Sequence, residues 1–74
     1  MAVVREFTLK ELERAPSHSE VKATISLTEQ NGERFIQIDT YGSKGRAIPG
    51  KTSQSLRLSQ SAFEQLTSYA AKHF

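Results

Sequence analysis

The sequence contains no cysteine and no tryptophan, and it has no long apolar run. Without cysteine there is no disulfide, the covalent link that stabilises many domains of this size. No segment approaches the roughly 20 apolar residues that a membrane-spanning helix requires. The first residues also lack the pattern of a secretory signal peptide. We therefore expect a cytoplasmic protein.

A chain of 74 residues forms one domain, residues 1–74, with a small core. Domains near this size bury only about 60% of the surface that their unfolded chain exposes, so they are marginally stable alone. The sequence offers neither a disulfide nor a cluster of metal ligands to compensate. Self-association is the remaining common source of stability, and we therefore expect a homodimer.

Catalytic residues are also scarce. The two histidines are His18, between two serines, and His73, next to the last residue, and neither has an activating acid at a usable spacing. We expect both side chains to be exposed to solvent. The sequence therefore predicts a protein that is not an enzyme and that needs no cofactor or metal.

One stretch, Gly45–Thr52, satisfies the letters of the phosphate-binding pattern GxxxxGK[ST]. That loop requires a buried parallel strand before it, a helix directly after its Lys-Thr pair, and a large α/β domain. Here Ser53–Leu58 follows, which is typical of a strand, and the chain is too short for such a domain. Nucleotide hydrolysis is therefore not expected.

The N-terminal segment predicts a short strand over Val3–Phe7, because Val3 and Phe7 share a face at period two. Thr8 and Glu11 have the spacing of a capping box. This spacing favours one helical turn over Leu9–Arg14, ended by the proline that follows. The alternative is that Leu9 and Leu12 lie in an irregular edge strand.

The clearest structural pattern is a β-hairpin. Apolar and polar residues alternate from Glu20 to Gln30, which predicts a half-buried antiparallel strand. Asn31 and Gly32 then form the pair that tolerates the positive φ angles of a two-residue turn. Arg34–Tyr41 is the expected return strand.

The last part of the chain predicts a strand over Ser53–Leu58 and then a helix. Ser59 is the expected N-cap, with Ser61 and Glu64 as an alternative capping box. An apolar stripe at spacings of three and four follows, formed by Phe63, Leu66, Ala70 and Phe74. The predicted fold class is α+β, a four-stranded antiparallel sheet followed by a C-terminal helix.

The return strand carries two aromatic residues, and both fall on the face opposite its isoleucines. If Ile36 and Ile38 face the core, alternation turns Phe35 and Tyr41 to the other side, among polar residues. A loop, a second subunit or the N-terminal segment could cover these two rings. The other explanation is a stacking platform, since aromatic faces on a sheet bind unstacked bases at about 1–3 kcal/mol each.

Positive charge is concentrated in the middle of the chain. Residues 1–33 carry four cations and six anions, whereas residues 34–58 carry five cations against Asp39 alone. The last 16 residues carry one charge of each sign. A basic segment of this kind is typical either of a solvated surface or of a nucleic-acid contact.

From Phe35 to Leu66 the chain resembles the single-stranded-DNA-binding domain of the transcriptional coactivator positive cofactor four and its small bacterial relatives. The segments that carry the resemblance are Ile36–Ile38 with Tyr41, Pro49–Lys51, Ser55–Leu56, and the helix with Phe63 and Leu66. The family often has a tryptophan directly after the tyrosine and a basic residue before it. This chain has Gly42 and Asp39 there.

The resemblance implies a homodimer built by the C-terminal helices, with single strands crossing the sheets largely without sequence preference. Cations would neutralise phosphates and aromatic rings would stack on bases. The candidate binding residues are Lys22, Arg34, Phe35, Tyr41, Lys44, Arg46, Lys51 and Arg57. The expected function is single-stranded nucleic-acid binding in transcription, replication or repair. The alternative is a small dimeric adaptor that binds a polypeptide.

Overall fold

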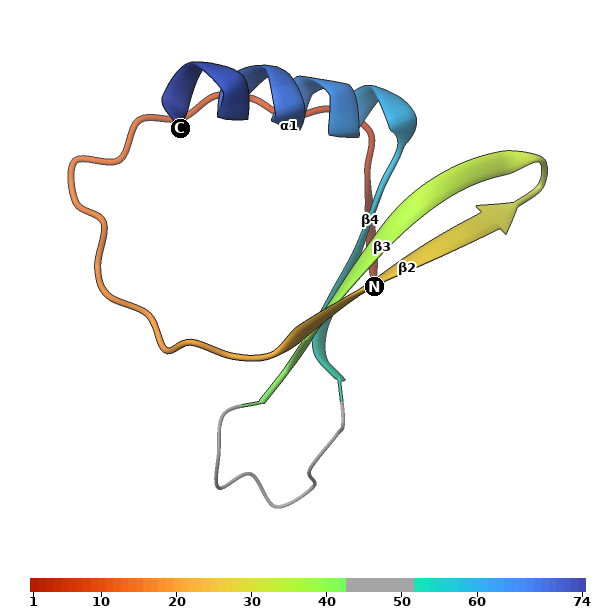
Figure 1. The fold of residues 1–74 in the computed structure, drawn as a ribbon, viewed down its shortest axis with the longest axis horizontal. Coiled ribbons are helices and arrows are strands. Elements are labelled where there is room, and N and C mark those ends of the chain that lie inside the picture. Colours follow the sequence, from red (N-terminus) through yellow and green to blue (C-terminus); the bar gives the residue numbers. More distant parts are fainter. Residues whose placement is uncertain (43–51) are drawn as a thin grey trace.

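The computed structural model describes residues 1–42 and 52–74, which form a sheet followed by one helix (Figure 1). The elements are β1 (Ala2–Val4), β2 (Ala23–Gln30), β3 (Glu33–Tyr41), β4 (Thr52–Leu58) and α1 (Gln60–His73). This is the predicted α+β arrangement, with four strands and a C-terminal helix. No helix in the described ranges is long and apolar enough to cross a membrane.

The strands lie in the order β1-β4-β3-β2. The pairs β2–β3 and β3–β4 are antiparallel, but β1 runs parallel to β4, with Val3 opposite Arg57. The predicted all-antiparallel sheet is therefore wrong at this edge. A parallel neighbour requires a long crossover, and here the entire β2–β3 hairpin and the segment before β4 separate the two strands.

The β2–β3 hairpin is confirmed. Asn31 and Gly32 have φ angles of 53° and 78°, the left-handed values that a two-residue hairpin turn requires. Their short polar or absent side chains tolerate this conformation. The first strand begins at Ala23, three residues later than its alternation suggested, although Lys22 still accepts a hydrogen bond from the backbone N–H of Tyr41.

Helix α1 begins as predicted after Ser59, whose side-chain oxygen accepts a hydrogen bond from the N–H of Ala62 at 3.2 Å. This contact satisfies one of the N–H groups that the first helical turn leaves without a partner. The N–H of Ser59 also donates to the C=O of Val4. The start of the helix is thereby attached to the end of β1.

The expectations for the N-terminal segment are wrong in detail. The strand covers Ala2–Val4 rather than Val3–Phe7, and Leu9–Arg14 forms neither a helical turn nor a strand. Residues 5–7 instead run beside α1 (Figure 1), where the side chain of Gln65 hydrogen-bonds the backbone of Phe7. Backbone groups that a strand would pair in a sheet are thus paired with the helix.

The core is small. Phe35, Leu58 and Ala62 are the buried apolar residues among those described, and no large side chain is fully buried. Helix α1 packs against β3 and β4. The expected core partners Ile25 and Leu27, on β2, are 70% and 83% exposed. They share a face with Ile36 and Ile38 as predicted, but their end of that face is uncovered.

Candidate nucleic-acid interface

One face of the sheet is lined by hydrogen-bonding side chains, and we call it the polar face. The strand register places Thr24, Asp39 and Ser55 in one row across three strands, and Ser26, Gln37 and Arg57 in the next. Directly paired residues project to the same side of a sheet. The polar face consists of Thr24, Ser26, Thr28, Gln37, Asp39, Tyr41, Ser55 and Arg57.

Hydrogen bonds connect the polar face from β4 to β2. Gln37 donates to both carboxylate oxygens of Asp39, at 3.1 and 3.2 Å, and the Ser55 hydroxyl donates to the same carboxylate. Arg57 donates from Nε to Gln37 at 2.8 Å and from Nη1 to Gln30 at 3.1 Å. Such a network fixes the side chains in one arrangement.

These contacts also determine the charge of the polar face. The hydrogen bond from Ser55, then that from Gln37, and finally the positive charge of Arg57 lower the pKa of Asp39 below its ordinary value. The carboxylate is therefore charged at neutral pH. The positive charge of Arg57, on the same face, is partly balanced by this anion.

Tyr41 lies at one end of the polar face. Its ring is half-buried, and its hydroxyl is 3.1 Å from the hydroxyl of Thr24 on the neighbouring strand. Its backbone N–H donates to the C=O of Lys22, which places this exposed lysine next to it. A register shift between Thr40 and Tyr41 changes the pairing with β4 at this point.

Three of the predicted cations, Lys44, Arg46 and Lys51, lie outside the described residues. The connection that carries them leaves the sheet after Tyr41 and rejoins it at Thr52, the residue paired with Tyr41. Both attachment points thus lie at the end of the sheet where Lys22 also lies.

Phe35, by contrast, is only 8% exposed, so its ring is not available for stacking in this structure. The guanidinium carbon of Arg5 lies 5.7 Å from the ring centroid, and Arg5 also forms two hydrogen bonds with Glu33, at 2.7 and 3.0 Å. The ion pair raises the pKa of Arg5 and lowers the pKa of Glu33. Of the two explanations offered by the sequence, the structure supports a ring covered by the N-terminal segment.

Arg34 is separated from the other candidates. It pairs with Glu29 in the strand register, and alternation turns its side chain to the side of the sheet opposite Tyr41 and Arg57. The structure therefore places Lys22 beside Tyr41, and it places Arg57 on the same face but farther along the sheet, where it bonds Gln37 and Gln30. Phe35 lies in the core and Arg34 on the opposite face.

The sequence reasoning missed the roles of Gln30, Gln37, Asp39 and Ser55, which form the hydrogen-bond network. Alternation alone would have placed Gln37 and Asp39 on one side of β3. Their partners on β2 and β4 depend on the strand register, which is set by contacts between distant segments. Only the hairpin part of that register could have been read from the turn.

Within residues 1–42 and 52–74, no group of three histidine, aspartate or glutamate side chains is placed to hold a metal ion. Searches of family models, of curated proteins and of solved structures gave no match to this chain.

Proposed function

We propose that this protein binds single-stranded nucleic acid on the polar face, largely without sequence preference, in transcription, replication or repair. The observation that carries the proposal is the position of Tyr41. An aromatic ring lies at the end of a hydrogen-bonding sheet face, beside Lys22 and at the point where the connection with three further cations is attached.

These groups supply the two interactions that a single strand requires. The exposed part of the Tyr41 ring offers a surface for an unpaired base, and any base stacks on it because every base has a π-face. Lys22, Lys44, Arg46 and Lys51 provide charge for the phosphates. A duplex keeps its bases stacked inside, so it gains only the phosphate contacts.

The side chains of Gln37, Asp39 and Ser55 have a supporting role in this proposal. They are already hydrogen-bonded to one another, so they form a fixed surface. The negative charge of Asp39 also repels phosphates from the centre of the face. We therefore place the strand's backbone near Lys22 and the basic connection, and not over Asp39.

The test is fluorescence anisotropy of a labelled single-stranded oligonucleotide, titrated with protein at two salt concentrations and with unlabelled duplex as competitor. We expect binding that weakens as salt rises and that duplex competes for poorly. Binding that is absent at low salt, or that does not respond to salt, contradicts the proposal, because each phosphate contact releases counterions.

A triple variant, Lys44→Ala with Arg46→Ala and Lys51→Ala, sharpens this test. Each phosphate contact contributes about 0.7 to the slope of log K against log salt for a single strand, so loss of three contacts lowers the slope by about 2. Lys72→Ala is the control, because Lys72 lies in the last turn of α1 and not on the strands that form the polar face. Its slope should equal that of the unaltered protein.

A protein-binding adaptor is the second candidate, and the position of β2 favours it. Within the described sheet β2 is an edge strand of eight residues. An edge strand offers unpaired backbone groups to which an extended peptide can add as a further strand. This function would survive the triple substitution of Lys44, Arg46 and Lys51, which separates it from nucleic-acid binding.

A further inference from the structure

The side of the sheet opposite the polar face is apolar over three strands, and we call it the apolar face. The register aligns Ile25 with Ile38 and Leu56, and Leu27 with Ile36 and Leu58. The apolar face consists of Ile25, Leu27, Ile36, Ile38, Leu56 and Leu58. Helix α1 covers the Leu58 end, whereas Ile25 and Leu27 are 70% and 83% exposed.

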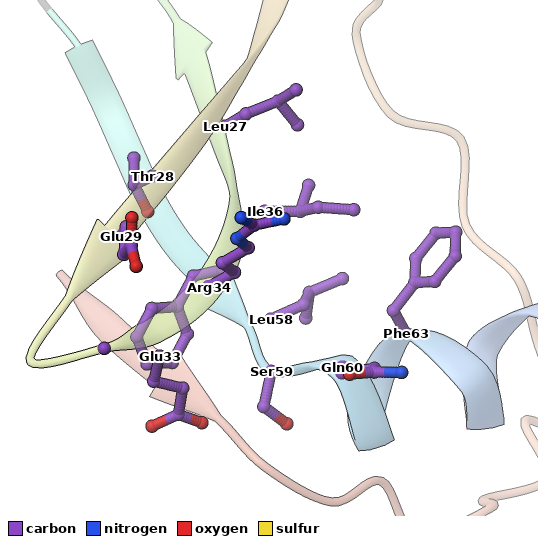
Figure 2. A pocket seen from close by; sticks show the side chains of 12 residues that line it. Leu27, Thr28, Glu29, Glu33, Arg34, Ile36, Leu58, Ser59, Gln60 and Phe63 are labelled. Carbon is purple, nitrogen blue, oxygen red and sulfur yellow. The ribbon is translucent and has the colours of Figure 1, made fainter.

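A groove of about 800 Å³ lies between this face and the start of α1. Leu27, Ile36 and Leu58 project into the space beside Phe63 (Figure 2). Phe63 and Leu66 on the helix are themselves 39% and 42% exposed. The exposed apolar surface is thus continuous from β2 to the helix. The groove within it is lined in part by the core residue Leu58.

The total surface of the chain shows how much of it is uncovered. A folded monomer of 8.3 kDa is expected to expose about 4600 Å², whereas this chain exposes 6728 Å². Residues 8–22 are all exposed and account for part of this excess. The exposed apolar side chains of Ile25, Leu27, Phe63 and Leu66 contribute to it as well, and a standard protein interface buries about 800 Å² on each partner.

We propose that a second copy of this chain occupies the apolar face and the groove. The apolar side chains that are exposed in one copy would then be buried against those of the other, in a core shared by the two. The contact would centre on Leu27 and include Ile25, Ile36, Phe63 and Leu66. The sequence-based expectation had placed it on the C-terminal helix alone. In this proposal the exposed end of the sheet, with Ile25 and Leu27, contributes the largest part of the dimer contact.

Charge at the margin of the groove favours an identical partner. Glu29 and Arg34 line it, are paired across the strands, and are both exposed. Neither makes an ion pair with another residue of the described ranges. Glu33, which also lines the groove, is already paired with Arg5. In a two-fold contact the same patch meets itself, so a margin that carries one unpaired acid and one unpaired base allows Arg34 of each copy to pair with Glu29 of the other.

This dimer does not depend on nucleic-acid binding, because the polar face lies on the other side of the sheet. It would leave Lys22, Tyr41 and Arg57 accessible in both copies. Two separate surfaces allow the two proposals to fail independently. Loss of dimerisation would be seen in the molecular mass, and loss of nucleic-acid binding would be seen in the anisotropy titration.

Sedimentation equilibrium of the full 74-residue chain, with a dilution series in the micromolar range, tests the proposal. We expect twice the mass of the 8.3 kDa chain. Leu27→Asp should give a monomer, or raise the dimer dissociation constant at least 30-fold, about the effect of a central interface residue. The matched control is Ser26→Asp, which adds the same charge to the same strand on the polar face and should remain a dimer.

Should Leu27→Asp not fold, Leu27→Thr replaces it, since threonine favours strands and removes most of the apolar contact. A folded, monomeric unaltered protein overturns the proposal and leaves the apolar face to a different partner. A dimer whose dissociation constant is the same in the Leu27 variants as in the unaltered protein also overturns it, because the interface must then lie elsewhere.

Discussion

The side-chain amide of Gln65 hydrogen-bonds both backbone groups of Phe7, accepting from its N–H at 2.8 Å and donating to its C=O at 3.3 Å. An amide is the group that matches this pair, because it carries a donor and an acceptor side by side. One residue of α1 thereby fixes a segment 58 positions earlier in the chain. Ser61 adds a hydrogen bond to the C=O of Arg5 nearby.

Gln65→Ala is expected to lower the free energy of unfolding by about 1–2 kcal/mol, since two partly buried hydrogen bonds are lost. Gln65→Glu should have an intermediate effect, because a carboxylate still accepts from the Phe7 N–H but has no proton to donate to its C=O. Urea unfolding measures both. Equal stability of Gln65→Ala and the unaltered protein would contradict the role assigned to this side chain.

Ser59→Ala should destabilise the protein by about 1 kcal/mol, the usual effect of removing an N-cap side chain. Ser59→Gly should cost only a few tenths of a kcal/mol, since glycine is itself tolerated at this position. Thermal or urea unfolding gives the comparison, with Ser68→Ala on the exposed side of α1 as control. If Ser59→Ala and Ser59→Gly were equally destabilising, the contribution of Ser59 to stability would come from packing and not from capping.

The parts of the fold that could be predicted depend on contacts close in sequence. The turn at Asn31 and Gly32 and the alternation around it predict the β2–β3 hairpin, and Ser59 with the apolar spacing after it predicts α1. The N-cap bond joins residues three positions apart, and the hairpin pairing starts at Gln30 and Glu33 on either side of the turn and extends outward from there. The pattern therefore contains both partners.

The parts that failed depend on distant partners. Thr8 and Glu11 have capping-box spacing, but one turn of helix without a packed apolar stripe is unstable alone, and Leu9 and Leu12 are 69% and 66% exposed. The pairing of β1 with β4 joins the first strand to the last. Nothing in three residues, Ala2–Val4, specifies that partner.

For the candidate site, too, the local features could be predicted and the features that depend on distant segments could not. Alternation placed Phe35 on the side of Tyr41 correctly, but it could not show that Arg5 would lie over the Phe35 ring. Alternation also implies that Arg34 lies on the opposite side of the strand, although the resemblance had included this residue among the binding residues. Side-chain direction is local information, whereas burial is decided by the rest of the chain.

Phe35 and Tyr41 should therefore respond differently to substitution. Phe35→Ala should destabilise the fold by about 3–5 kcal/mol, the range for a buried phenylalanine. Tyr41→Ala should weaken single-strand binding by about 5- to 150-fold, which corresponds to the loss of one stacked base. Anisotropy titration and urea unfolding of each variant make the comparison.

Two milder substitutions serve as controls for this pair. Tyr41→Phe keeps the ring and removes only the hydroxyl that contacts Thr24, so it should bind almost as the unaltered protein does. Phe35→Leu keeps an apolar side chain in the core and should leave the affinity unchanged. Weaker binding by Phe35→Leu at full folding would mean that the ring is exposed in solution and contacts the ligand.

The hydrogen bond from Ser55 to Asp39 predicts a dependence of stability on pH. The folded protein holds the pKa of Asp39 below its ordinary value of 3.8, so the unfolded chain binds the proton more readily. The free energy of unfolding therefore contains a contribution that is present above the unfolded pKa. That contribution is lost as the pH falls through the lowered pKa of the folded state.

Asp39→Asn should thus flatten the acid limb of a plot of the free energy of unfolding against pH. Ser55→Ala should return the pKa of Asp39 toward its ordinary value, because the largest cause of the shift is removed. Urea unfolding between pH 2 and 7 measures the first effect, and NMR titration of the Asp39 carboxyl carbon measures the second. Glu11→Gln is the control, since Glu11 is exposed and forms no hydrogen bond with the described residues through its side chain. Identical acid limbs for Asp39→Asn and Glu11→Gln would show that the network across β3 and β4 does not hold this carboxylate in its charged form.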